Sequence, residues 1–222
     1  MGWSAPVDLY CERIGSDLLA EPLNAISNIA FFLAAFIAAR HALASSRARG
    51  DLFLWLLITL VIVIGAGSTI FHVAATRWSV LADVVPITLF IVAFFLYAMR
   101  RFLGLNWLAA LMVTAAFYFA SWVFGQSLPP EFMNGSGNYL PVFIALLGVG
   151  SLLMVRNHPA GPWLAGAAGI FLFSLTFRTI DNAICSLLPI GVHYFWHVLN
   201  GIMLFLLLEA GVRFGRREAP RV

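Results

Sequence analysis

LFLWLLITLVIVIGAGSTIFHVA, residues 52–74, is a run of apolar residues in which His72 is the only titratable side chain. A stretch of about 17–25 apolar residues is what an α-helix needs to cross the hydrocarbon core of a bilayer. Because lipid offers no hydrogen-bond partners and no alternating barrel pattern is present, the backbone must be satisfied within helices. The sequence therefore predicts an all-α integral membrane bundle of seven transmembrane helices. The other six spans are expected at roughly 22–43, 80–99, 106–125, 139–155, 163–184 and 192–213.

The composition agrees with this interpretation. The chain has 222 residues, of which 62% are hydrophobic and 10% charged, which excludes an ordinary soluble domain. The spans use nearly the whole chain, so we expect one domain over residues 1–222, with an outer segment, residues 1–21, before the first span. This segment has no signal-peptide pattern, and the first span is expected to act as its own signal-anchor.

The positive charges predict the topology. The chain has no lysine, and ten of its thirteen arginines fall at one set of alternating span ends: Arg40, Arg47, Arg49, Arg100, Arg101, Arg156, Arg213, Arg216, Arg217 and Arg221. The positive-inside rule then places the N-terminus outside and the C-terminus in the cytoplasm. The formal net charge of +3 follows from this topology and does not indicate nucleic-acid binding.

Three histidines are candidate metal ligands. His193 and His197 lie four residues apart, so a helix would present them on one face about 6 Å apart, a spacing that allows two imidazoles to share a metal. His72 ends the second span on the side where His193 opens the seventh. Three imidazoles with a fourth position left for water describe a catalytic zinc site. The alternative is that the histidines form hydrogen bonds with neighbouring helices.

Two further polar residues are expected near these histidines. Ser68 precedes His72 by one helical turn, and Asp83 lies at the outer start of the third span. Beside a zinc-activated water, a carboxylate can act as general base and a hydroxyl can donate to a developing oxyanion. The alternatives are a Ser68 hydroxyl bonded to its own helix and an Asp83 side chain that caps a helix.

Other outer residues allow more than one interpretation. Arg178 and Asp181 are three residues apart in the sixth span, where an intrahelical ion pair is favoured over substrate head-group binding by Arg178. Trp196 lies between the paired histidines and is a candidate substrate contact. Cys11 and Cys185 both fall on the outer side, where a disulfide and two free thiols are both compatible with the sequence.

Several motifs resemble the alkaline ceramidase family, part of a group of seven-span membrane hydrolases that includes the adiponectin-type receptors. They are DLYCE (8–12), AEPLNAISN (20–28), GAGSTIFH (65–72) with LADVVP (81–86), IDNAIC (180–185) and HYFWHVLNG (193–201). The resemblance implies that His72, His193 and His197 bind zinc, that Asp83 is the acid–base residue and that Ser68 is an oxyanion or water-positioning group. It also implies that Cys11 and Cys185 form a disulfide.

The resemblance further implies a calcium site built from Asp8, Glu12 and Glu21. The chain departs from the family pattern here: one extra residue separates Asp8 from Cys11, Ile14 stands where a polar ligand is expected, and the gap to Glu21 is shorter. Calcium takes six to eight oxygen ligands, so three acids are few. Solvated acids or helix caps are the alternative.

These observations favour a zinc-dependent hydrolase that cleaves the amide of ceramide-like N-acyl lipids to a fatty acid and a sphingoid base by metal-activated water. The alternatives are a seven-span receptor with a structural zinc, a hydrolase of another lipid class, and haem ligation by paired histidines. Retinal is excluded because the chain has no lysine. The expected partners are the bilayer and a lipid substrate, with no nucleic acid and no obligate protein partner. The short loops favour a bacterial plasma membrane over the endoplasmic reticulum or Golgi.

Overall fold

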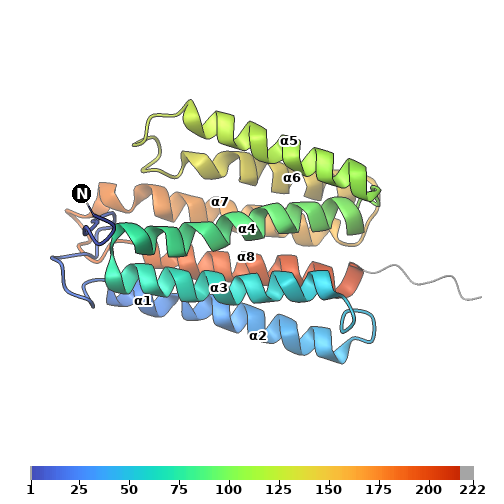
Figure 1. Cartoon of the computed structure of the whole chain (residues 1–222), viewed down its shortest axis with the longest axis horizontal. Helices are drawn as coiled ribbons and strands as arrows, with labels where there is room; N and C mark the ends of the chain where they lie inside the picture. The colour runs from blue at the N-terminus through green and yellow to red at the C-terminus, as the bar shows by residue number, and fades with distance from the viewer. Residues whose placement is uncertain (1, 216–222) are drawn as a thin grey trace, which may run out of the picture.

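Seven segments of the computed structural model, which describes residues 2–215, are long and apolar enough to cross a membrane. They lie side by side in one bundle (Figure 1). The elements are α1 (Pro22–Ser27), α2 (Ile29–Ala44), α3 (Leu52–Ala74), α4 (Arg77–Arg101), α5 (Trp107–Gln126), the 3-10 turn η1 (Gly137–Tyr139), α6 (Leu140–Val155), α7 (Gly161–Ile180), the 3-10 turn η2 (Asn182–Ile184) and α8 (His193–Phe214). The predicted all-α bundle of seven spans is confirmed. The orientation of the termini stays a prediction, and Arg216, Arg217 and Arg221, which contributed to it, lie outside the described residues.

Two spans differ from their predicted form. The first is divided at Asn28, where α1 ends and α2 begins, and the Asn28 side-chain amide donates to the Asn24 carbonyl at 2.9 Å. A side chain that competes for backbone carbonyls in this way favours a break. The sixth ends at Ile180 instead of 184 and continues into η2. Both departures lie at the end of the bundle that carries the outer segment.

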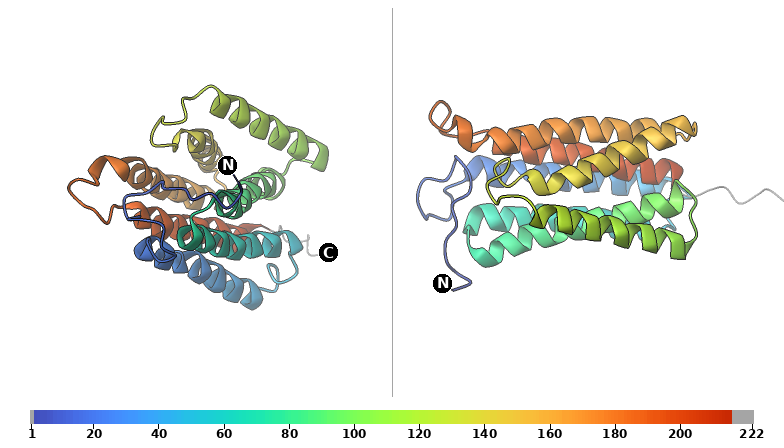
Figure 2. Two further views of the ribbon diagram at one scale, coloured as in Figure 1. Left: turned by 60° about the vertical axis from the view of Figure 1, so that its left-hand side comes forward. Right: turned by 90° about the horizontal axis from the view of Figure 1, so that it is seen from above.

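Helix α8 is the centre of the bundle. In its most apolar window 67% of the residues are buried, against 11% for the windows of α5 and α6. It packs against α2, α3 and α7, whereas α5 and α6 lie at the edge (Figures 1 and 2). The side chains of His193, Trp196 and His197 near the start of α8 are therefore buried.

The helices α3 and α4 approach each other closely near the predicted site. A two-residue turn, Ala75–Thr76, joins them, and the outer segment pairs with it because the Val7 N–H donates to the Ala75 carbonyl at 2.8 Å. A Cβ atom added to Gly67 would lie 1.9 Å from the Ala82 carbonyl oxygen. The absence of a side chain at Gly67 thus brings Asp83 of α4 beside α3.

We expect Gly67→Ala to destabilise the fold. The added methyl group has no space against the α4 backbone, and overpacking of this kind costs about 1–3 kcal/mol. The thermal unfolding temperature in detergent should fall, whereas Gly148→Ala, which meets nothing within 4 Å, should leave it nearly unchanged. Equal unfolding temperatures for the two variants would contradict the close α3–α4 contact.

Candidate metal centre

The three predicted histidines meet at the end of the bundle that carries the outer segment, and this end is named the outer end after that segment. His72 is in the last turn of α3, His193 is the first residue of α8 and His197 lies one turn later. Each is no more than 2% exposed, and one ligand nitrogen from each lies within 4.8 Å of the others. The Nε2 atoms of His72 and His197 are 3.1 Å apart. The helical spacing and the shared depth have therefore produced a compact cluster.

Neighbouring side chains fix the orientation of two of these rings. His72 Nδ1 lies 2.5 Å from Glu21 Oε2, and His197 Nδ1 lies 2.7 Å from Ser27 Oγ. Ser27 already donates its proton to the Asn24 carbonyl at 2.8 Å, so the His197 ring must donate to it. The Glu21 carboxylate likewise accepts a hydrogen bond from Nδ1–H of His72. In the neutral form both rings then carry a lone pair on Nε2.

The third ring, His193, is held differently. Tyr10 of the outer segment stacks on it with 3.6 Å between ring centroids, and burial raises the pKa of the Tyr10 hydroxyl to about 12. The backbone N–H of His193 donates to Asp181 Oδ1 at 3.0 Å. Its Nδ1 is buried and has no hydrogen-bond partner among the described residues.

This arrangement fits a bound metal ion. Two facing lone pairs 3.1 Å apart repel each other unless a cation lies between them. Tetrahedral zinc with Zn–N bonds of 2.0–2.1 Å separates its nitrogen ligands by about 3.3 Å, close to the observed distance. Hydrogen bonds from the second ring nitrogen to a carboxylate or hydroxyl are also typical of metal-binding histidines. The three histidines together therefore form a ligand set that suits zinc.

The Glu21 carboxylate is charged despite its position. Burial opposes its ionisation, but the hydrogen bond from His72, together with those from Arg13 and Asn24, outweighs this effect and leaves the pKa of Glu21 below its ordinary value. The side chain is 1% exposed. It is thus a buried anion beside a candidate ligand, a role that the sequence did not reveal.

Asp83 and Ser68 lie together next to the histidines. Asp83 Oδ1 is buried without a hydrogen-bond partner among the described residues. Asp83 lies seven residues inside α4, which begins at Arg77, so the helix-cap alternative is wrong. Both residues line a cavity with His197 and Asn200.

The cavity is polar at one end and apolar along the rest of its length. Below Ser68, Asp83 and Asn200 its walls are apolar side chains, most of them from α4, α6, α7 and α8, and they continue along α4 as far as Ala98. Fifteen residues of helix from Asp83 to Ala98 rise about 22 Å. The candidate metal centre therefore opens into a long apolar space inside the bundle.

Arg178 and Asp181 do not form the expected ion pair. Asp181 instead accepts from the N–H groups of Val192 and His193 through Oδ1 and from Cys11 through Oδ2, at 2.7, 3.0 and 3.0 Å. Arg178 donates to Ser136 Oγ at 2.7 Å and lies 5.5 Å above the Trp196 ring. The prediction was wrong because α7 ends at Ile180, which directs the Asp181 side chain toward the start of α8.

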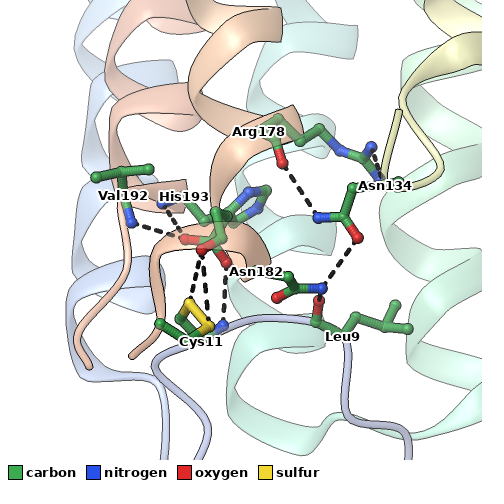
Figure 3. Close-up of a disulfide and its surroundings, with 9 residues drawn as sticks. Leu9, Cys11, Asn134, Arg178, Asn182, Val192 and His193 are labelled. Carbon is green, nitrogen blue, oxygen red and sulfur yellow. Dashed lines mark hydrogen bonds between the residues drawn. A yellow bond between two sulfur atoms is a disulfide. The ribbon is translucent and has the colours of Figure 1, made fainter. Parts of the chain in front are cut away.

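The outer segment is attached to this end of the bundle. Cys11 and Cys185 form the disulfide that the resemblance implied, with 5.4 Å between their Cα atoms. Asn182 extends the attachment by donating to the Leu9 carbonyl at 3.1 Å and to Asn134 Oδ1 at 2.9 Å (Figure 3). The segment therefore covers the cluster as a fixed layer.

The acids of the implied calcium site have separate roles. Asp8 is exposed, Glu12 accepts from the N–H groups of Leu23 and Asn24 at 2.6 and 2.8 Å, and Glu21 bonds to His72. Glu12 is thus a cap of α1. Within residues 2–215, the three histidines are the only group of three or more His, Cys, Asp or Glu side chains close enough together to hold one ion. The structure does not support the calcium site.

Four contributors were missed by the sequence analysis. Tyr10, Ser27 and Asn200 were not singled out, and Glu21 was assigned to calcium. Asn200 carried a detectable signal, since an asparagine within an apolar span is costly, and its Oδ1 is buried without a partner among the described residues. The other three depend on how the outer segment and α1 fold over the histidines.

Comparison with known proteins gives one family. A family model described as Ceramidase matches residues 4–214, nearly the whole chain. Comparison with curated proteins finds no match.

We expect replacement of any one histidine to abolish stoichiometric metal binding. His197→Ala removes one of three ligands, and Ser27→Ala, which leaves the ligands in place, should weaken metal affinity by roughly 10-fold, as loss of a supporting hydrogen bond does. Elemental analysis of purified protein and chelator competition measure the two effects. His41→Ala at the opposite end of the bundle should retain the metal, and loss of metal from that control would contradict this assignment.

Proposed function

Because the chain belongs to the ceramidase family, whose members hydrolyse the amide bond of ceramide, we propose that it is a zinc-dependent amidase acting within the membrane. Its substrates are ceramide-like N-acyl lipids, and its products are a fatty acid and a sphingoid base. One observation carries the proposal: three buried histidines, Asp83 and Ser68 meet at the polar end of a long apolar cavity.

The ligand set favours zinc. Neutral imidazoles suit zinc, and three protein ligands leave a coordination position for the reaction. When bound, the ion supplies Lewis acidity, which polarises the amide carbonyl and makes a water molecule acidic enough to attack.

Asp83 moves the proton. As the water oxygen bonds to the carbonyl carbon, the Asp83 carboxylate accepts the proton of that water. It then delivers the proton to the amide nitrogen as the C–N bond breaks, so the amine leaves neutral. Its Oδ1 has no hydrogen-bond partner among the described residues and is free to take this role.

Ser68 and Trp196 act on the substrate from two sides. The Ser68 hydroxyl, which lines the same cavity as Asp83, donates to the carbonyl oxygen as negative charge develops there. Trp196 lines the cavity and contacts the lipid. Arg178 is not among the cavity-lining residues and stacks on Trp196, so its role is to position that ring.

The apolar part of the cavity holds the acyl chain. Phe90, Phe94, Leu146 and Leu204 are among its walls, and such a surface favours hydrocarbon over water. A substrate that never leaves the bilayer can therefore bind with its amide at the histidines and its chain between α4, α6 and α8.

The mechanism predicts different losses for two variants. His197→Ala should lose both metal and activity. Asp83→Asn should keep the metal but lose about 10²–10⁴-fold in turnover, the usual contribution of acid–base catalysis. The assay is fatty-acid release from a panel of ceramides and other N-acyl and ester lipids in detergent, with a chelator-treated control. Turnover at the wild-type rate in either variant would refute the mechanism, and release from an ester lipid alone would assign another lipid class.

The cavity predicts acyl-chain selectivity. Ala145 of α6 lines the cavity, and Ala145→Phe should fill part of it, so turnover of long-chain substrates should fall more than turnover of short-chain ones. Ile144→Phe on the same helix is a matched control because Ile144 is 64% exposed. Unchanged chain-length preference in Ala145→Phe would contradict the assignment of the cavity to the acyl chain.

A further inference from the structure

Arg13 pairs with Glu21, one of the three acids of the implied calcium site. Its side chain is only 3% exposed. The guanidinium forms an ion pair with Glu21 Oε1 and donates to the carbonyl oxygens of Gly15, Asp17 and His72, at 3.5, 3.4 and 3.0 Å. One carboxylate and several backbone carbonyls are the kind of oxygen ligands that bind calcium in proteins. Here the same kind of ligand set is bound to an arginine.

The buried Glu21 carboxylate requires a positive partner. An ionised carboxylate without a counter-ion in an apolar interior is very costly. Arginine provides that charge under all working conditions because its guanidinium does not deprotonate in proteins. Its planar fork also allows it to reach Glu21 and backbone carbonyls together.

Arg13 is connected to the metal centre by two routes. The first runs through Glu21, whose other oxygen lies 2.5 Å from His72 Nδ1. The second is direct, because Arg13 Nη2 donates to the His72 carbonyl at 3.0 Å. One guanidinium therefore acts on both the ring and the backbone of the same candidate ligand.

We propose that Arg13 is a built-in cation that takes the place of a bound calcium ion in the outer segment and positions His72 for metal binding through Glu21. The proposal rests on the proposed function in one respect, the assignment of His72 as a zinc ligand. It makes this chain independent of calcium, because the charge that holds the outer segment against α3 belongs to the chain itself.

The first experiment is a calcium titration of the full-length protein in detergent after passage over a chelating resin. We expect no change in thermal unfolding temperature through the millimolar range, which includes the weakest calcium modules. A rise in unfolding temperature on addition of calcium would overturn the proposal. This measurement needs neither bound zinc nor enzymatic activity, so its result is independent of the proposed function.

The second experiment measures zinc affinity by competition with a chromophoric chelator. Arg13→Ala and Glu21→Gln should each weaken zinc binding by about 10- to 100-fold, as loss of supporting contacts to a ligand does. The double variant should lose less affinity than the two single losses combined, because one of the two routes from Arg13 to His72 runs through Glu21. Asp8→Asn, an exposed acid of the same segment, is the matched control and should bind zinc like the wild type.

Conservative replacement distinguishes positioning from general support of the fold. Arg13→Lys keeps a positive charge for Glu21 and should recover part of the zinc affinity lost in Arg13→Ala. If Arg13→Ala does not fold, comparison of Arg13→Lys with the wild type and Glu21→Gln decides the question. Wild-type zinc affinity in Arg13→Ala, or additive losses in the double variant, would refute the proposed role of Arg13.

Discussion

The cost of burying polar side chains in an apolar interior governs the outer end of this molecule. A buried donor or acceptor without a partner costs about 1–3 kcal/mol, and an unpaired charge costs more. The bundle nevertheless buries three histidines and the carboxylates of Glu12, Glu21 and Asp181 there, together with Oδ1 of Asp83. It does so by supplying partners from distant parts of the chain: Glu21 for His72 and Ser27 for His197. The outer segment and α1 are thus a condition for the burial of the histidines.

At the opposite end of the bundle, the inner end, buried polar side chains are also present, but almost all of them are paired with one another. Asp51 caps α3 by accepting from the Phe53 N–H at 3.1 Å and pairs with Arg101 at 3.2 Å. Glu209 is paired with Arg213 at 2.6 Å and with His41 at 2.8 Å. Of the six buried side-chain atoms without a partner among the described residues, only Arg100 Nε lies at this end. The unpaired groups, and with them the capacity for chemistry, are concentrated at the outer end.

The features that follow from local periodicity could be predicted from the sequence. A segment in lipid must satisfy its own backbone hydrogen bonds, so the seven helical spans follow from hydropathy. The four-residue spacing of His193 and His197 places both side chains on one face of their helix. The helix ends were less predictable. The break at Asn28 and the end of α7 at Ile180 depend on side chains that compete with the helical backbone. The expected Arg178–Asp181 pair was wrong for this reason, since its three-residue spacing has meaning only inside a continuous helix.

The supporting contacts of the metal centre could not be predicted because they join residues 51 to 170 positions apart. Glu21 meets His72, Ser27 meets His197, and the Cys11 N–H meets Asp181, each across the outer end of the bundle. Helices in lipid have little hydrophobic drive to adopt one relative position, whereas metal binding requires ligand distances to be correct within about 0.2 Å. Residues 10–27 contact all three histidines through Tyr10, Glu21 and Ser27, while the disulfide and Asp181 attach the same segment to the start of α8. The covering segment therefore supplies the positional accuracy that packing between the spans does not supply by itself.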